Sequence, residues 1–87
     1  MTVRVEFFGL ARRTAGCAFL DVEAATLGDA IERIREELPQ LASICFADRT
    51  LSAGYLANVN GKQFTRDPEC PLKPGDSVLI LSNDMGG

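Results

Sequence analysis

The first residues of the chain alternate between apolar and polar side chains, which is the pattern of a half-buried β-strand. In Thr2–Phe8, one face carries the apolar residues Val3, Val5 and Phe7. A second alternating segment occurs at Cys17–Val22. We interpret the intervening Leu10–Gly16 as a connecting loop, because it contains two arginines and a glycine. Two consecutive strands joined by a short loop most simply form an antiparallel hairpin.

An apolar stripe with helical spacing follows this predicted hairpin. Its members lie three or four residues apart and are Leu27, Ala30, Ile31, Ile34 and Leu38. This spacing places them on one face of an amphipathic helix. Thr26 is a suitable N-cap, and Asp29 at the third helical position gives an acidic variant of the capping box. Pro39 ends the helix, because the residue before a proline is disfavoured in the helical region.

The second half of the chain predicts mainly strands and turns. We expect one helical turn within Gln40–Phe46 and a polar loop at Ala47–Ser52. Strands are predicted at Tyr55–Asn60, Lys62–Thr65 and Ser77–Leu81. The first two form a hairpin, because both residues of Asn60-Gly61 tolerate a positive φ. The segment between the last two strands, Arg66–Pro74, is irregular because it contains three prolines.

This order of elements predicts the α+β class. One helix among hairpins covers one face of a single mixed sheet. The last strand, Ser77–Leu81, is apolar on both faces, which is typical of a strand at the centre of a sheet. If Val78 and Ile80 face the helix, then Leu79 and Leu81 point outward, where the sequence offers no obvious cover.

The composition is that of one ordinary globular domain. The chain has 87 residues, of which 46% are hydrophobic and 24% charged. The longest apolar run, Val78–Leu81, is far shorter than the roughly 20 residues of a membrane-spanning helix. The first residues do not resemble a secretory signal. We therefore expect a cytoplasmic protein without a membrane partner.

The charge distribution argues against nucleic-acid binding. The formal net charge is −3, and the nine Lys and Arg residues are scattered along the chain. Binding to nucleic acid needs a concentrated basic face. An acidic surface serves solubility, or it fits a partner with a basic docking groove.

The cysteine and histidine content excludes several kinds of active site. There are three cysteines, Cys17, Cys45 and Cys70, and no histidine. The cysteines are too far apart in sequence for a zinc motif, and an odd number cannot form a complete disulfide framework. Catalysis that depends on histidine is impossible. We expect reduced thiols, no metal site and no intrinsic catalytic residue.

Several short motifs, taken in their order, resemble the MoaD/ThiS family of ubiquitin-like sulfur-carrier proteins. They are Val3–Gly9 with Arg12, Thr26–Ala30, Val59–Lys62, Leu72–Val78 and the terminal Gly86-Gly87. The resemblance covers the whole length and implies a β-grasp fold, with a mixed sheet of four to five strands and one main helix. It also implies that residues 1–81 form the domain and residues 82–87 a flexible C-terminal tail.

The resemblance implies chemistry at the C-terminus. A partner enzyme adenylates the carboxylate of Gly87, which is then converted to a thiocarboxylate that donates sulfur. ATP is used by that partner, so the carrier needs no cofactor and is not itself an enzyme. Gly86 and Met85 form the part of the tail that enters a narrow channel, which suits glycine because it lacks a Cβ. The implied partners are an adenylyltransferase of the ubiquitin-activating type, a sulfurtransferase and the large subunit of molybdopterin synthase.

The tail departs from the family at Ser82–Met85, where many small subunits of molybdopterin synthase carry prolines. The chain length nevertheless favours molybdenum cofactor biosynthesis over the thiamine pathway. Three alternatives stay open: a sulfur carrier for thiamine, cysteine, tRNA or a specialised metabolite; a ubiquitin-like modifier conjugated to lysines; and a non-covalent interaction module.

The resemblance also places the first and last strands side by side, so Phe8 lies near the outward-facing Leu79 and Leu81. An exposed apolar cluster beside a reactive tail is typical of a partner-docking surface. Alternatively, these leucines pack under the loop Arg66–Leu72.

Overall fold

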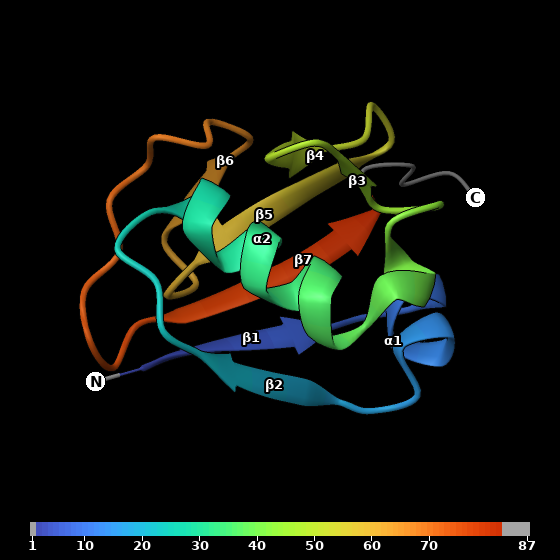
Figure 1. Ribbon diagram of the computed structural model, residues 1–87. Coiled ribbons are helices and arrows are strands. Elements are labelled where there is room, and N and C mark those ends of the chain that lie inside the picture. The colour runs from blue at the N-terminus through green and yellow to red at the C-terminus, as the bar shows by residue number, and fades with distance from the viewer. Residues whose placement is uncertain (1, 83–87) are drawn as a thin grey trace.

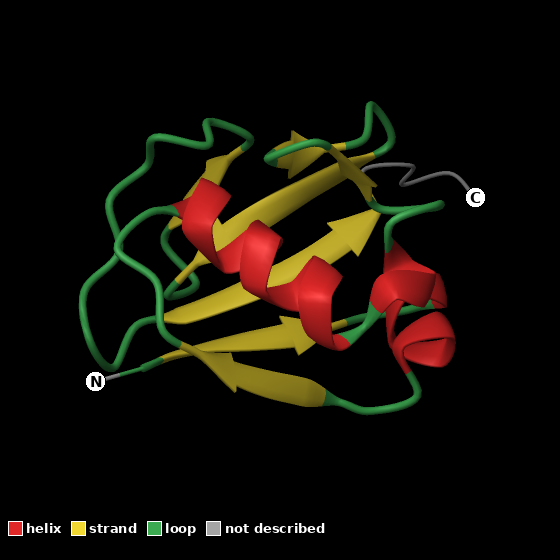
Figure 2. Cartoon of the chain, viewed as in Figure 1, coloured by secondary structure: helices red, strands yellow, loops and turns green. Residues whose placement is uncertain are grey.

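A computed structural model describes residues 2–82 and confirms the α+β class. One helix, α2, lies across one face of a five-stranded mixed sheet, as Figures 1 and 2 show. The elements are β1 (Val3–Phe7), α1 (Leu10–Ala15), β2 (Phe19–Val22), α2 (Leu27–Glu37), the 3-10 helix η1 (Pro39–Leu41), β3 (Phe46–Ala47), β4 (Thr50–Leu51), β5 (Tyr55–Val59), β6 (Gln63–Thr65) and β7 (Ser77–Ser82). No helix among these is long and apolar enough to span a membrane.

The strand order in the sheet is β2-β1-β7-β5-β6. The predicted hairpins β1–β2 and β5–β6 are both present and antiparallel. β7 lies between them, parallel to β1 and antiparallel to β5, with Val5 opposite Val78 and Ala57 opposite Ile80. The prediction that the last strand is central is therefore confirmed. The strand that leads into the C-terminal residues is held on both sides.

The core lies between the sheet and α2. In β1, Val3, Val5 and Phe7 are buried while the residues between them are exposed. In β7, Val78 and Ile80 are also buried. They meet the apolar stripe of α2, whose fully buried members are Leu27, Ala30, Ile31 and Ile34. The sequence pattern of alternating strands and a helical stripe thus gives one continuous hydrophobic core.

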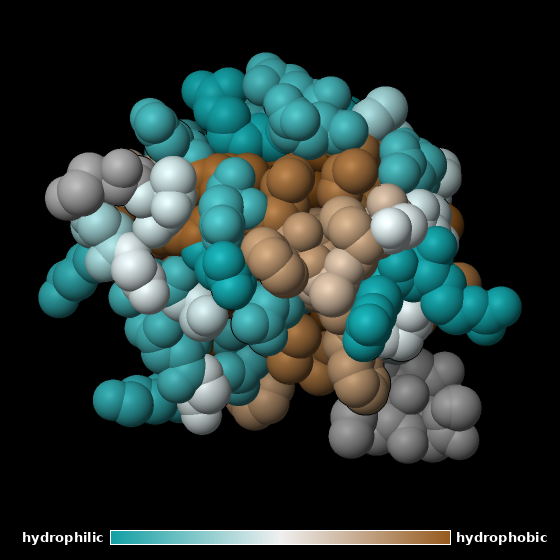
Figure 3. Space-filling model, turned by 90° about the horizontal axis from the view of Figure 1, so that it is seen from below, coloured by the Kyte–Doolittle hydropathy of each residue, from teal (hydrophilic) through white to brown (hydrophobic). Residues whose placement is uncertain are grey.

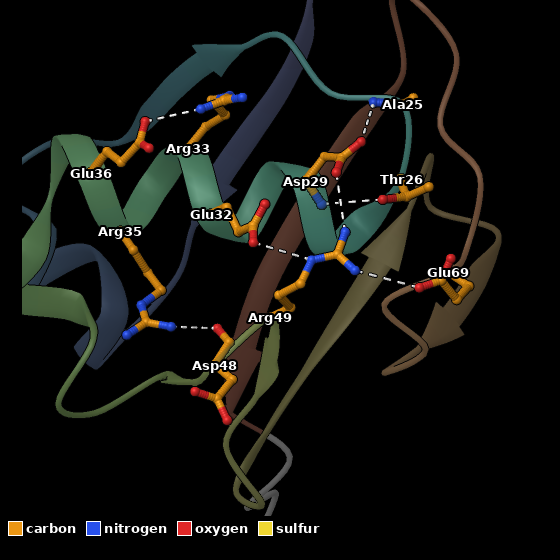
Figure 4. A network of polar contacts seen from close by, with 10 residues as sticks. All are labelled: Ala25, Thr26, Asp29, Glu32, Arg33, Arg35, Glu36, Asp48, Arg49 and Glu69. Carbon is orange, nitrogen blue, oxygen red and sulfur yellow. Dashed lines mark hydrogen bonds and ion pairs between the residues drawn. The ribbon is translucent and has the colours of Figure 1, made fainter.

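The N-terminus of α2 is capped as the sequence predicts. The Thr26 Oγ1 accepts a hydrogen bond from the Asp29 backbone N–H at 3.1 Å. The Asp29 carboxylate in turn accepts from the backbone N–H of Ala25 at 3.3 Å, as Figure 4 shows. The Asp29 N–H, which the first helical turn leaves without a backbone partner, is satisfied in this way, and the Asp29 carboxylate also holds the residue before the N-cap. The helix ends before Pro39, which begins η1.

The interpretation of Leu10–Gly16 as a loop was wrong, because residues Leu10–Ala15 form the helix α1. Its buried residues, Ala11 and Ala15, are one helical turn apart and pack into the core. Gly16 ends the helix with φ of 79°, a left-handed conformation that glycine adopts without strain. Arginine and alanine are good helix formers, so the two arginines favour this helix rather than a loop.

The interpretation of Ala47–Ser52 as a loop was also wrong, because β3 and β4 form a small antiparallel hairpin. Asp48 lies in its turn with φ of 55°, a value that Asp tolerates better than most residues. The predicted Asn60-Gly61 turn is confirmed, with φ of 57° and 70° at the two positions. These values are those of the hairpin turn that matches the twist of β-strands.

Candidate functional site

The predicted docking residues lie together on the face of the sheet that α2 does not cover. In β7, Leu81 is opposite Leu56 of β5. On the other side of β7, the backbone N–H of Phe8 donates to the carbonyl of Ile80 at 3.2 Å, which places Phe8 beside the end of β7. We refer to Phe8, Leu56, Leu79 and Leu81 as the outer apolar patch.

The residues of this patch are open to solvent to different degrees. Phe8 has 64% of its surface exposed, whereas Leu56, Leu79 and Leu81 are half-buried. Their neighbours in β7, Val78 and Ile80, are at most 1% exposed and face α2. The alternation of β7 thus separates a core face from an outer face, as the sequence indicated.

The loop between β6 and β7 is anchored on the face of the sheet opposite to Leu79 and Leu81. Its residues are bonded to the start of α2, which lies on the opposite face of the sheet. The bonds are Gly28 N–H to Pro68 O at 2.8 Å, Leu27 N–H to Cys70 O at 2.9 Å and Leu72 N–H to Ala25 O at 2.9 Å. Figure 1 shows this loop at the end of the sheet where β7 begins. Leu81 is the last residue but one of β7, at the opposite end of that strand.

Two residues near this patch were missed as candidates. Leu10 is 56% exposed at the start of α1, which packs against β1 and β7. It escaped notice because its segment reads as a loop. Leu56 alternates with the buried residues Tyr55 and Ala57, but only the register of β5 with β7 makes it a neighbour of Leu81.

The remaining candidates, Met85, Gly86 and Gly87, lie outside the described residues. What the structure places is the strand that leads to them. Ser82, the last residue of β7, is opposite Tyr55 of β5. The predicted reactive terminus therefore follows, in sequence, a strand that is fixed between two neighbours and that carries Leu79 and Leu81 of the outer apolar patch.

The three cysteines are free thiols, and one of them is deeply buried. Cys45 has no exposed surface, and this burial raises the pKa of its thiol to about 11. Cys70 is buried elsewhere, and Cys17 is half-buried. Within residues 2–82, no three Cys, Asp or Glu side chains lie close enough together to bind a metal ion. The buried Cys45 is protonated at neutral pH and is thus a poor nucleophile.

Comparison with known proteins gives no match to a family model and none to a curated protein. Solved structures do match. SAMP1 from Haloferax volcanii has a TM-score of 0.83 at 21% identity, with all of both chains covered. A chain of the BexX/CysO complex from Amycolatopsis orientalis has a TM-score of 0.81 at 20% identity, over 98% of this chain and 99% of that one. The chain has a β-grasp fold.

A third match is a putative molybdopterin converting factor subunit 1 from Pyrococcus furiosus. Its TM-score is 0.76 at 25% identity, over 94% of this chain and 97% of that one. These neighbours are ubiquitin-like proteins of the MoaD/ThiS type, as the sequence motifs indicated. The fold implied by that resemblance is thereby confirmed, because the β-grasp superposition extends over nearly the whole chain.

Proposed function

We propose that this β-grasp protein is a sulfur carrier whose C-terminal Gly87 is activated by a partner enzyme, and that it supplies sulfur for molybdenum cofactor biosynthesis. The observation that carries the proposal is the position of β7. This central strand leads directly into the sequence that ends in Gly86-Gly87. The likeness to a molybdopterin converting factor subunit supports the choice of pathway.

The proposed chemistry takes place on the terminal carboxylate. A carboxylate oxygen of Gly87 attacks the α-phosphorus of ATP and displaces pyrophosphate, which leaves an acyl adenylate. A hydrosulfide equivalent, delivered by a sulfurtransferase, then attacks the carbonyl carbon and displaces AMP. The product is a thiocarboxylate. All catalytic groups belong to the partners, so the carrier acts as their co-substrate in the cytoplasm.

The outer apolar patch is the proposed docking surface for these partners. It lies beside the end of β7, so a partner bound there has the tail within reach. One of the similar structures is itself a complex of two proteins, BexX and CysO. This supports the idea that the fold docks onto larger partners. An adenylyltransferase of the ubiquitin-activating type and the large subunit of molybdopterin synthase are the partners that we propose.

A second function, conjugation to lysines as a protein modifier, is favoured by a different observation. The highest TM-score given above belongs to SAMP1, a small archaeal modifier protein. The same activated Gly87 would acylate a lysine amine of the target protein instead of accepting sulfur. Conjugates of higher mass in extracts of the native host, detected with an antibody to this chain, would distinguish the modifier from a pure sulfur carrier.

The experiment that tests the proposal changes the last residue. We expect deletion of Gly87, or addition of one residue after it, to abolish pyrophosphate–ATP exchange by the cognate activating enzyme. A residue added before Met1 is the matched control and leaves exchange unchanged. Normal exchange by the protein without Gly87 would contradict the proposal.

The intact mass of the protein from its native host gives an independent readout. A thiocarboxylate adds about 16 Da by exchange of oxygen for sulfur, and oxidation of Met or Cys adds nearly the same. Alkylation of the thioacid separates the two. The same measurement shows whether the mature chain ends at Gly87.

Gly86→Val should fold normally but fail in transfer, because a β-branched side chain restricts and widens the tail.

A further inference from the structure

One edge of the sheet has backbone groups that are available for pairing. β2 is an outermost strand, and within residues 2–82 it pairs with β1 alone. The backbone N–H of Phe7 donates to the carbonyl of Ala18 at 3.0 Å. Because hydrogen-bonded and non-hydrogen-bonded pairs alternate in an antiparallel ladder, the backbone groups of Phe19 and Asp21 point away from β1. They form the free edge of the sheet.

A groove lies between this edge and the second half of α2. Its volume is about 510 Å³. Its lining residues come from β2, from the residue that follows β2 and from α2; they are Leu20, Asp21, Val22, Glu23, Arg33, Glu36 and Glu37. Figure 3, which views the molecule from below, shows a continuous apolar area on the side where β2 lies, with hydrophilic side chains above it. We call the groove that is lined by these seven residues the β2 groove.

The charges that line the β2 groove are predominantly negative. Two of its carboxylates are already paired: Asp21 with Arg4 at 2.9 Å, and Glu36 with Arg33 at 3.0 Å. The carboxylates of Glu23 and Glu37 are exposed and have no hydrogen bond or ion pair with any other described residue. The groove therefore presents unneutralised carboxylates beside unpaired backbone donors and acceptors.

We propose that the β2 groove binds an extended basic peptide of a partner protein, which adds to β2 as a further strand. Backbone hydrogen bonds to Phe19 and Asp21 supply the pairing. Alternate side chains of the peptide then face opposite sides of the sheet. Lys or Arg at one set of positions reaches Glu23 and Glu37. Apolar residues at the other set contact the part of the Phe19 ring that stays exposed beside the Arg4 guanidinium, which lies 3.9 Å from the ring centroid.

Charge argues against a second copy of the chain as the occupant. Two β2 edges paired with each other would bring the same carboxylates together, and the chain as a whole has a net charge of −3. The opposite edge of the sheet is also less suitable, because β6 is only three residues long. The proposal goes beyond the carrier function, since it uses neither Gly87 nor the outer apolar patch.

The test uses a short synthetic peptide in which Lys and Val alternate. Two further versions carry N-methyl groups on the backbone, one at every Lys and the other at every Val. Only one set of nitrogens faces β2 in an added strand. We therefore expect one methylated peptide to bind about tenfold more weakly and the other to keep the parent affinity. Amide hydrogen exchange at Phe19 and Asp21 should slow when the parent peptide binds. Equal affinities of the two methylated peptides would mean attraction by charge alone and would overturn the proposal.

Matched variants test the assignment to the β2 groove. Glu23→Gln/Glu37→Gln removes two charges from the groove, and we expect it to weaken binding about threefold to tenfold. Asp48→Asn/Asp67→Asn removes two charges from exposed turns elsewhere and should have no effect. Equal losses in the two variants would contradict the proposal. Concentration-dependent self-association through β2, measured by sedimentation without peptide, would assign the groove to a second copy and also overturn it.

Discussion

The guanidinium group of Arg49 lies against the α-carbon of Gly28. A Cβ at position 28 would come within 2.8 Å of Nη2 and 2.9 Å of Cζ of Arg49. In this position Arg49 reaches the carboxylates of Asp29, Glu32 and Glu69 at 3.1, 3.3 and 3.5 Å (Figure 4). The turn between β3 and β4 is thereby tied to the start of α2 and to the loop that precedes β7.

This contact predicts an unusual effect of Gly28→Ala. Alanine normally stabilises a helix relative to glycine by up to about 1 kcal/mol. Here its methyl group displaces Arg49 from the three carboxylates, so we expect a loss of about 1 kcal/mol in the free energy of unfolding. In an Arg49→Ala background the loss should be smaller, because only the contact of the methyl group with the Pro68 carbonyl oxygen, at 3.1 Å, remains. Urea denaturation of the four proteins measures the difference, and equal effects in both backgrounds would show that the contact has no energetic role.

The outer apolar patch predicts that Leu81→Asp separates binding from folding. Leu81 is half-buried on the outer face, so the substitution should change thermal stability little. Binding to the activating enzyme should weaken by on the order of 2 kcal/mol, the loss typical of a hot-spot side chain. Gln63→Asp, at an exposed position of β6 on the opposite face of the sheet, is the control. If Leu81→Asp unfolds the domain, Leu81 belongs to the core and the docking surface lies elsewhere.

The sequence predicted those elements whose pattern is local. The alternation in β1, the stripe and cap of α2, and the Asn60-Gly61 turn each depend only on residues that are close together in the sequence. The helix α1 was missed because six residues are too short for a periodic stripe, and burial of Ala11 and Ala15 depends on elements distant in sequence. The strands β3 and β4 were missed because two residues have no period.

Only part of the candidate site could be predicted, because strand alternation is a local pattern and the order of strands in the sheet is not. Alternation alone places Leu79 and Leu81 on one face of the last strand. Their proximity to Phe8 and Leu56 depends on the strand order, which no local pattern specifies; only the resemblance to a known family suggested that the first and last strands pair. The role of Gly87 comes from the resemblance and from the chemistry of a terminal carboxylate, and it stays a prediction.

The cysteines should be dispensable for sulfur transfer if sulfur is carried on the terminal carboxyl. We expect the triple variant Cys17→Ser/Cys45→Ser/Cys70→Ser to be thiolated normally, with a loss of stability on the order of 1 kcal/mol or more at the buried positions. In the unmodified protein, Cys45 should resist alkylation at pH 8 until the chain unfolds, because burial raises its pKa to about 11. A folded triple variant that cannot be thiolated would show that a cysteine relays the sulfur.

The Asp76 carboxylate predicts a pH-dependent contribution to stability. It accepts from the Lys73 backbone N–H at 2.8 Å and from Asn60 Nδ2 at 3.0 Å. These hydrogen bonds lower its pKa in the folded state. The stabilisation is therefore fully present above the unfolded-state pKa of about 4 and is lost as the pH falls through the lower folded-state value.

We expect Asp76→Asn to be less stable than the unmodified protein at pH 7 and to approach it in stability near pH 2. Urea denaturation across this pH range measures the difference. Asp48→Asn, in another exposed turn, is the control for removal of a charge. If the free energies of unfolding of Asp76→Asn and of the unmodified protein differ by the same amount at every pH, the hydrogen bonds do not favour the ionised form.

The central place of β7 also determines how the sheet can be assembled. Both hairpins, β1–β2 and β5–β6, join residues close in sequence, and such pairings form quickly. They can be united only when residues 77–82 insert between them, and the pairing of Val5 with Val78 closes a loop of most of the described chain. Closure of so long a loop is slow relative to local contacts, so this single step should limit the folding rate. A chain that ends before β7 would lack the strand that joins the two hairpins, so the native topology and the proposed reactive C-terminus are gained together or lost together.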